Sequence, residues 1–230
     1  MQDGARRRAK ELPIWSGPVS PEPLPGGISN TNFTVVDDGR RYVVRVGADA
    51  PEHAVWRFNE VTVSRAAHAA GLSPEIRHHE PDVLVMDFIE NGQALDEKAV
   101  RETDTLARIV ALVRRCHAEL PRHLEVPGPM FWVFSANRRY ARMIEAAGER
   151  LSDRLAELMA LNDRLEAGVG PIRPVFCHND LLAANLIDDG ERLWLIDWEH
   201  AGISSPLFDL ANLSSNNGLA ASQETWLLET

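Results

Sequence analysis

Two short polar segments in the last quarter of the chain combine residue types that can carry out chemistry. Residues 178–185 read HNDLLAAN, and residues 196–199 read IDWE. A carboxylate such as Asp180 can orient a hydroxyl group and take its proton. Asn185 and Asp197 supply oxygen atoms, which are the ligands that Mg²⁺ prefers. The two segments therefore predict a site that combines a general base with a divalent cation.

The spacing of these residues narrows the chemistry. The pattern H-x-D-x-x-x-x-N is typical of the catalytic loop of kinases, in which a later strand-borne aspartate holds the metal. It predicts phosphoryl transfer, with Asp180 as the base and with Asn185 and Asp197 as Mg²⁺ ligands. Any one of these residues alone is better explained as a turn residue, because Asn and Asp are common in loops. All of them at this spacing, between apolar strands, favour the catalytic interpretation.

Two upstream features follow in the order expected of a kinase. Residues 26–30, GGISN, precede a predicted strand, and the backbone N–H groups of such a loop can cover phosphates. A Gly-Gly pair before a strand is, however, more often a plain turn. Arg45 stands where kinases place a phosphate-contacting lysine, and Glu60 on the next predicted helix can pair with it. A surface arginine and a solvated glutamate would explain the two residues equally well without the loop, but either charge buried alone is costly.

The elements that must position these residues fall into two groups. Residue types typical of strands occur at 33–36, 42–46, 75–79 and 83–89. The intervening Asp-Asp-Gly-Arg at 37–40 predicts a hairpin, and a helix is predicted over 53–70 with Gly71 as its stop. The first ninety residues are thus expected to form a small sheet with one main helix.

The rest of the chain has a helical pattern. Apolar residues recur at helical spacing from residue 102 onward, including segments around 131–147 and 151–165. Short strands are predicted at 175–178, 185–187 and 193–197, and a hinge at 91–93. We therefore expect an α+β fold with two lobes, a small antiparallel-sheet lobe at 1–90 and a larger, mainly helical lobe at 91–230.

Composition limits the partners. Lys and Arg total 24 and Asp and Glu total 34, so the net charge of −10 argues against nucleic acid or an anionic membrane as a partner. Cys116 and Cys177 show no metal-binding or disulfide spacing. No apolar run is long enough to cross a bilayer. We expect a cytoplasmic protein without membrane insertion, and the sequence does not indicate its oligomeric state.

With these features the chain resembles the choline/ethanolamine kinases, within the wider superfamily of aminoglycoside phosphotransferases and protein-kinase-like enzymes. The resemblance rests on residues 26–30 with Phe33, on Arg45 in YVVRV, on Glu60, on MDFI at 86–89, on residues 178–185 and 196–199, and on FDLAN at 208–212. It implies a kinase-like fold that uses ATP and Mg²⁺ to phosphorylate the hydroxyl group of a small amino alcohol, choline or ethanolamine.

The resemblance also implies roles for individual residues. Ser29 and Asn30 would approach the ATP phosphates. The backbone of Asp87, Phe88 and Ile89 would form the adenine hinge, and the acidic Glu199 would face the cationic acceptor. Asp209 would brace the catalytic loop through hydrogen bonds, and His178 would orient that loop.

Other interpretations stay open at this point. An aminoglycoside or thiamine acceptor is compatible with the same motifs. Choline kinases continue through further C-terminal helices whose aromatic residues line the ammonium pocket, and this chain stops near the point where those helices would begin. We therefore expect a C-terminally shortened form, and an inactive nucleotide-binding remnant is the alternative from a different class.

Overall fold

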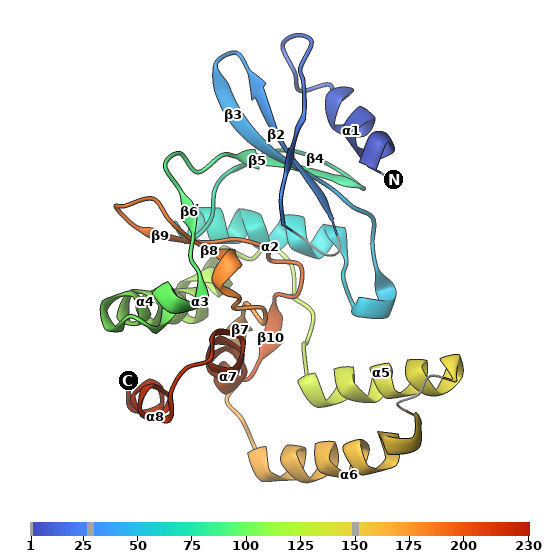
Figure 1. Cartoon of the computed structure of the whole chain (residues 1–230), viewed down its shortest axis with the longest axis vertical. Helices are drawn as coiled ribbons and strands as arrows, with labels where there is room; N and C mark the ends of the chain where they lie inside the picture. The colour runs from blue at the N-terminus through green and yellow to red at the C-terminus, as the bar shows by residue number, and fades with distance from the viewer. Residues whose placement is uncertain (1, 27–29, 149–151) are drawn as a thin grey trace.

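The computed structural model describes residues 2–26, 30–148 and 152–230, with the side chains of residues 152 and 153 left out of the description. An antiparallel sheet forms the first part of the molecule (Figure 1). Its spatial order is β1 (Glu22–Leu24), β2 (Thr31–Asp37), β3 (Arg40–Val46), β5 (Val83–Asp87) and β4 (Ile76–Glu80). The predicted strands are thus confirmed, although β5 ends at Asp87 rather than at residue 89.

The hairpin between β2 and β3 forms where the sequence predicts it. Asp37 pairs with Arg40 across a two-residue turn. Asp38 and Gly39 both have positive φ angles, of 47° and 73°. A turn with two left-handed residues matches the right-handed twist of its flanking strands, and Asp-Gly is a favoured sequence for it. This turn sets the register that places Arg45 opposite Asn32.

Helix α1 (Gln2–Lys10) packs against the sheet at β2 and β3 (Figure 1). Ala9 of this helix and Leu12 after it are buried with Phe33, Val35 and Val44 of the two strands. These side chains alternate along the strands, so that one face of the sheet is apolar and faces α1. Arg45 follows Val44 in β3, and its side chain therefore lies on the opposite face of the sheet.

Helix α2 (Arg57–Ala69) begins later than the sequence predicts. The prediction of a helix from residue 53 is wrong, because a short 3₁₀ turn, η1 (Pro51–His53), is followed by Ala54 with a φ of 57° and by extended Trp56. The Asp49 carboxylate accepts a hydrogen bond of 2.7 Å from the Arg57 N–H and so serves the first turn of α2. The helix ends before Gly71, whose φ of 70° fits the predicted stop.

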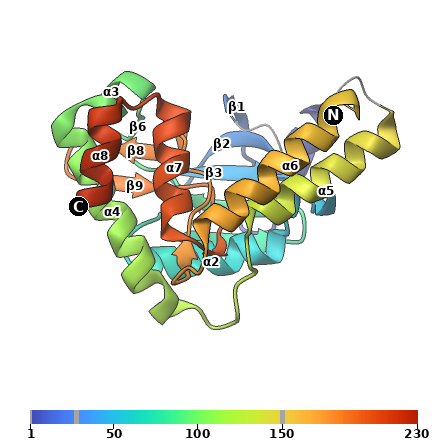
Figure 2. The same ribbon diagram turned by 90° about the horizontal axis from the view of Figure 1, so that it is seen from below.

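Helices make up most of the second part of the chain. They are α3 (Glu97–Arg101), α4 (Thr103–Glu119), the 3₁₀ turn η2 (Leu120–His123), α5 (Val133–Ala147), α6 (Ser152–Val169), α7 (Pro206–Asn217) and α8 (Ala221–Glu229). Helices α5 and α6 run antiparallel and side by side (Figure 2). Both helices lie where the sequence predicts them, although α6 continues past residue 165.

Short strands in this part carry the two polar segments. Strand β7 (Val175–Cys177) pairs with β10 (Gly202–Ser204), and β8 (Leu186–Asp188) pairs with both β6 (Gln93–Ala94) and β9 (Leu193–Leu195). Residues 178–185 connect β7 to β8 and end in the 3₁₀ turn η3 (Ala183–Asn185). Residues 196–199 follow β9. Residues 178–185 lead into β8, and residues 196–199 leave its partner β9 next to the start of β8, so the two segments meet.

One apolar cluster joins the two parts of the molecule. Val63 and Ala67 of α2 are buried together with Ile109 of α4, Leu195 of β9 and Trp198. Helix α2 thus packs its apolar side against the helical part, although it precedes residue 90 in the chain. The two-lobed α+β architecture is confirmed, and the lobe boundary at residue 90 stays a prediction. Within the described ranges, no helix is long and apolar enough to cross a membrane.

Candidate active site

His178 links the two polar segments. Its side chain is fully buried. Ring atom Nδ1 accepts a hydrogen bond of 3.2 Å from the Asp180 N–H, and Nε2 donates to the Ile196 carbonyl at 2.9 Å. This arrangement requires the neutral tautomer that carries its proton on Nε2. The ring also packs edge-on against Trp198, with centroids 4.7 Å apart. His178 therefore lies between the segments as a spacer, with both ring nitrogens in use.

Asp209 holds the start of the catalytic loop from helix α7. Its carboxylate accepts hydrogen bonds from the backbone N–H groups of His178, at 3.1 Å, and of Asn179, at 2.7 Å. Asn179 has a φ of 67°, a left-handed conformation that costs energy for a residue with a side chain. The contacts of Asp209 stabilise this conformation, and they are the contacts expected of a brace for the loop.

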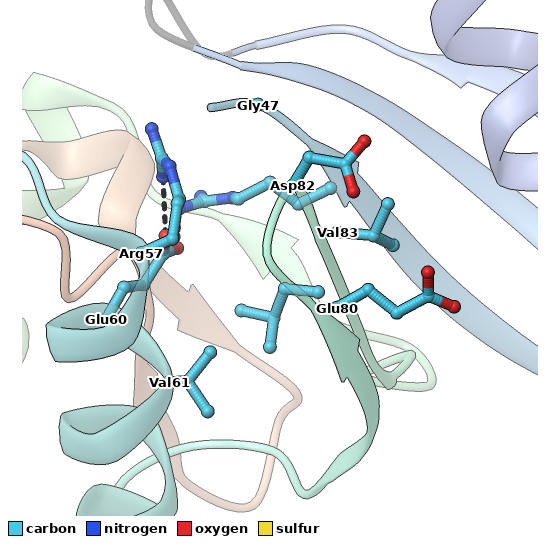
Figure 3. Close-up of a pocket in the computed structure, with 9 residues that line it drawn as sticks. Gly47, Arg57, Glu60, Val61, Glu80, Asp82 and Val83 are labelled. Carbon is cyan, nitrogen blue, oxygen red and sulfur yellow. Dashed lines mark hydrogen bonds and ion pairs between the residues drawn. The ribbon is translucent and has the colours of Figure 1, made fainter. Parts of the chain in front are cut away.

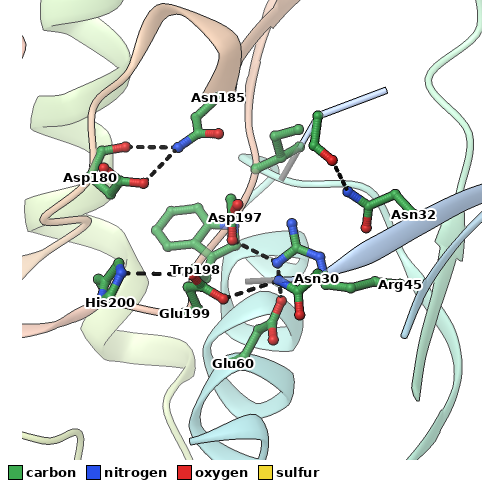
Figure 4. Close-up of polar contacts among 12 residues, drawn as sticks. Asn30, Asn32, Arg45, Glu60, Asp180, Asn185, Asp197, Trp198, Glu199 and His200 are labelled. Atoms are coloured by element: carbon green, nitrogen blue, oxygen red, sulfur yellow. Dashed lines mark hydrogen bonds and ion pairs between the residues drawn. The ribbon is translucent and has the colours of Figure 1, made fainter. Parts of the chain in front are cut away.

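Asp180 and Asn185 lie side by side in the loop of residues 178–185 (Figure 4). The Asn185 amide nitrogen donates to the Asp180 carbonyl at 2.9 Å and to its carboxylate at 3.1 Å. Burial raises the pKa of the Asp180 carboxyl group, and the nearby Asp197 carboxylate adds to this effect. A carboxylate with a raised pKa is a stronger base than an ordinary aspartate.

Asp197 meets Arg45 across the cleft (Figure 4). The Arg45 guanidinium donates to the Asp197 carboxylate at 2.6 Å and also contacts Glu60 of α2. Burial alone would lower the pKa of Arg45, but the two carboxylates outweigh it and raise the pKa. Burial likewise opposes ionisation of Asp197, and Arg45 outweighs it, so the pKa of this carboxyl group is lowered. Arg45 and Asp197 are therefore both held in their charged forms.

Arg57 extends this ion cluster and was missed by the sequence analysis. Its guanidinium contacts Glu60 at 2.5 Å and Glu199 at 3.2 Å, and its Nε donates to the Ala48 carbonyl at 3.0 Å. Arg57 and Glu60 are three residues apart on α2, a spacing that brings side chains together and could have indicated the pair. The contact with Glu199 bridges 142 residues and carries no local signal.

The arginine–glutamate pair of α2 is part of the scaffold rather than of a ligand pocket. Figure 3 shows Arg57 and Glu60 in contact, with Val61 directly after Glu60 on the helix and Gly47 and Val83 opposite. These residues border a cavity of only 10 Å³, which is about the space of one water molecule. Its size excludes a nucleotide or an amine, so these charges serve to hold Arg45 and Glu199.

Glu199, which the resemblance places facing the cationic acceptor, is largely buried. It is only 7% exposed. Besides Arg57, its carboxylate accepts a hydrogen bond of 3.1 Å from the Asn30 amide (Figure 4), and its other oxygen lies 3.6 Å from His200 Nε2. Asn30, expected at the ATP phosphates, thus lies next to Glu199. Ser29, expected beside it, falls outside the described residues.

The expected adenine hinge lies at the end of β5. The N–H groups of Asp87 and Phe88 donate to the carbonyls of Glu75 and Arg41, at 2.9 and 3.2 Å. The Asp87 side chain makes two hydrogen bonds to Arg77, at 2.8 and 2.7 Å. Of the three hinge N–H groups, only that of Ile89 has no hydrogen-bond partner within the described part of the chain. This N–H is the hinge donor that can contact a base.

A cavity of about 320 Å³ lies between the sheet and the catalytic loop. The expected hinge residues Asp87 to Ile89 line it, together with the apolar side chains of Met86, Ile187 and Ile196. Arg45, Asn185 and Asp197 line it as well. A cavity that combines apolar walls with charged and polar groups suits a nucleotide, which has a planar base and a chain of phosphates.

The donor atoms of this cavity suit a magnesium ion. Asn185 uses its amide nitrogen on Asp180, so its carbonyl oxygen is left for another partner. Asp197 offers a carboxylate on the same cavity. Arg45 and Arg57 pair with Glu60, Asp197 and Glu199, and Asp180 lies near Asp197, so the carboxylates outnumber the guanidinium groups. Oxygen donors with net negative charge favour a hard divalent cation.

The sequence matches a known protein family. Residues 20–229 match the phosphotransferase enzyme family. The LicA protein of Haemophilus influenzae is 29% identical over 210 residues, which cover 89% of this chain and 60% of that protein. Ethanolamine kinase 2 of Mus musculus is 30% identical over 223 residues, which cover 91% of this chain and 57% of that protein. The chain thus spans about 60% of the length of these two relatives.

A solved structure supports the same relationship. A choline/ethanolamine kinase family protein from Mesorhizobium loti superposes with a TM-score of 0.73 at 27% sequence identity. The superposition covers 99% of this chain and 74% of that one. The similarity includes both the sheet and the helical part, so the kinase-like architecture extends over the whole chain.

Proposed function

The chain belongs to the phosphotransferase enzyme family, and we propose that it transfers the γ-phosphoryl group of ATP to the hydroxyl group of choline or ethanolamine. One observation carries this proposal. A single cavity is lined by a hinge, by Arg45 and by the oxygen donors Asn185 and Asp197, and the carboxylate of Asp180 is hydrogen-bonded to Asn185. The names of ethanolamine kinase 2 and of the Mesorhizobium loti structure support the choice of acceptor.

The nucleotide side of the proposal assigns a task to each group. The apolar side chains that line the cavity pack against the adenine, and the Ile89 N–H donates to it. Arg45 contacts the phosphates, since Glu60 and Asp197 fix its guanidinium at the cavity wall. Asn185 and Asp197 hold Mg²⁺, which when bound neutralises charge on the phosphates. Such pre-oriented charges reduce the reorganisation that the transfer requires.

The acceptor side centres on Asp180. Its carboxylate accepts a hydrogen bond from the acceptor hydroxyl and takes the proton as that oxygen bonds to the γ-phosphorus and the bond to ADP breaks. The raised pKa of Asp180 suits this task. The excess of carboxylates around the site attracts the ammonium group of the acceptor. Glu199 contributes to this field even while it contacts Arg57.

The cytoplasm is the compartment that we propose. ATP is plentiful there, and the enzyme would depend on it. Cys116 and Cys177 are both buried and unpaired, as expected of thiols in a reducing compartment.

An acceptor panel tests the proposed function. The purified chain is incubated with Mg·ATP and with choline, ethanolamine, thiamine or an aminoglycoside, and phosphorylated product is detected by mass spectrometry. We expect product from choline or ethanolamine and none from the Asp180→Asn variant. Product from thiamine or the aminoglycoside alone would shift the acceptor within the family. No product from any acceptor, despite saturable Mg·ATP binding, would favour the nucleotide-binding remnant.

A further inference from the structure

A turn at residues 89–92 lies between the expected hinge and β6, at the edge of the cavity. It is closed by a hydrogen bond of 3.1 Å from the Gly92 N–H to the Ile89 carbonyl. Ile89 and Gly92 both line the cavity, and Asn91 lies between them in the chain. A chemical change at Asn91 would therefore act directly on the cavity wall.

The packing of this turn requires a glycine at position 92. A Cβ atom there would lie 2.6 Å from Cγ2 of Ile89 and 2.7 Å from Cγ2 of Ile187, which is closer than such atoms approach one another. Asn91 has a φ of 57°, a left-handed conformation that Asn adopts more readily than most residues with a side chain. The fold thus favours the dipeptide Asn-Gly at this place.

Asn-Gly is the dipeptide in which an asparagine side chain reacts most readily with its own backbone, because glycine has no Cβ to hinder the approach. The Gly92 nitrogen loses its proton to solvent and bonds to Cγ of Asn91. The bond from Cγ to Nδ2 breaks, and Nδ2 takes up a proton and leaves as ammonia. Water then opens the resulting succinimide ring at one of its two carbonyls, which gives aspartate or isoaspartate.

The sequence contains two Asn-Gly pairs, at 91–92 and 217–218, and the structure distinguishes them. Asn217 ends α7 and has no exposed surface. Its amide nitrogen donates to the carbonyls of Leu181, at 3.1 Å, and Leu213, at 2.8 Å. Asn91 is exposed, and its amide has no hydrogen-bond partner among the described residues. Asn91 is therefore free to react where Asn217 is held.

We propose that Asn91 is a site of spontaneous deamidation and that isoaspartate at this position weakens Mg·ATP binding. The first part rests on the structure alone, and the second rests on the proposed function. Isoaspartate carries the main chain through the former side chain and lengthens it by one methylene group. The turn then loses either its hydrogen bond to Ile89 or the packing of Gly92 against Ile187. Either loss moves the residue whose N–H is the hinge donor.

The turn hydrogen bond restrains the reaction. The Gly92 nitrogen must leave the Ile89 carbonyl before it can attack the side chain of Asn91. A single hydrogen bond in an exposed turn opens readily. A base bound against Ile89 would keep the turn closed, so Mg·ATP should slow the reaction at Asn91.

Peptide mass spectrometry tests the first part. The wild-type chain is incubated at mildly alkaline pH, with and without saturating Mg·ATP, and then digested with trypsin. Asn91 is the only asparagine in the peptide of residues 78–98, and Asn217 lies in the peptide of residues 193–230. Deamidation replaces an amino group by a hydroxyl group and adds about one dalton. We expect Asn91 to react at least about tenfold faster than Asn217, which reacts only after local opening.

Asn91→Gly is the matched variant for the second part. It removes the reactive amide and adopts the left-handed φ without strain. Isothermal titration compares fresh and aged samples of both proteins. Aged wild type should lose Mg·ATP affinity in proportion to its isoaspartate content, whereas aged Asn91→Gly should bind as tightly as its fresh sample.

The outcomes separate this inference from the proposed function. An unmodified Asn91, or equal rates at Asn91 and Asn217, would overturn the modification site. Unchanged affinity in a wild type converted to isoaspartate would overturn the link to the cavity, as would an equal loss in aged Asn91→Gly or a rate that saturating Mg·ATP leaves unchanged. A fresh chain that binds no Mg·ATP would overturn the proposed function, while the peptide masses would still decide the modification site.

Discussion

The cavity lies between a sheet wall, which carries Arg45, and a helical wall, which carries the catalytic loop of residues 178–185. The two walls hold their functional groups by different means. On the sheet wall, Arg45 is held by carboxylates, through Glu60 of α2 and Asp197 across the cleft. On the helical wall, the start of the catalytic loop is held by hydrogen bonds from the backbone N–H groups of His178 and Asn179 to one carboxylate, Asp209. A buried charge that loses its partner destabilises the whole fold. A loop that loses a hydrogen bond changes its geometry first. The difference predicts that substitutions on the sheet wall affect stability, whereas those on the helical wall affect rate.

The largest expected effect is on the helical wall. Asp180→Asn should lower kcat by about 10²–10⁴-fold, the usual contribution of a positioned base. Mg·ATP affinity and melting temperature should change little, because the substitution keeps the shape of the side chain. Steady-state kinetics and nucleotide titration measure both quantities. A loss of nucleotide affinity as large as the loss of rate would contradict the role of Asp180 as base.

The next effect is on the sheet wall. Glu60→Ala removes a carboxylate shared by Arg45 and Arg57 and should cost about 3–5 kcal/mol of unfolding free energy, as for other broken buried pairs. In a chain of this size each kcal/mol lowers the melting temperature by about 2–4 °C. Calorimetry or urea unfolding measures this loss.

A surface pair provides the control for that experiment. Glu90→Ala removes the partner of Arg41, whose side chain is 45% exposed. Solvent screens such a pair, so the melting temperature should stay close to the wild-type value. Equal losses of melting temperature for Glu60→Ala and Glu90→Ala would show that burial does not determine how much these ion pairs contribute to stability.

Asp197 lies on the helical wall and pairs with Arg45 of the sheet wall, so its substitution tests both walls. Asp197→Ala should weaken ATP binding in Mg²⁺ more than in EDTA, because the lost contact acts through the ion. Isothermal titration in the two buffers measures the ratio. An identical loss in both buffers would remove Asp197 from the metal site and leave it only as a partner of Arg45.

The smallest effect is expected far from the cleft, where Arg8 of α1 bonds to Asp82 at 2.9 Å. The hydrogen bond from Arg8 lowers the pKa of Asp82 although burial opposes it. A lowered carboxyl pKa adds stability that is fully present at neutral pH and is lost as the pH falls through the folded-state pKa. Arg8→Met should therefore cost about 0–1 kcal/mol at neutral pH.

Unfolding in urea at a series of pH values measures this difference. The gap between the wild type and Arg8→Met should shrink only below the usual aspartate range, and Arg7→Met, at an exposed neighbour on the same helix, should show no such trend. A gap that widens toward low pH would contradict the assigned sign.

Local patterns were sufficient for much of the fold. Asp38-Gly39 predicts the β2–β3 turn because the two residues tolerate left-handed angles, and Gly71 predicts the end of α2 for the same reason. The start of α2 was missed, because the left-handed Ala54 breaks the helix without any signal in its residue type. Residues 178–185 and 196–199 predicted phosphoryl transfer, because the spacing of their polar residues can be read from a single sequence.

Contacts between distant segments were decided by the tertiary structure. Arg57 meets Glu199 across 142 residues, and His117 meets Asp209 across 92. Neither pair has a spacing that a helix or strand would bring together, so no periodicity indicates them. The sequence by itself determined which residue types the site contains and in what order. Only the packing of α2 and α4 against the loop segments decided which charges neutralise each other, because burial and partner distance depend on the whole fold.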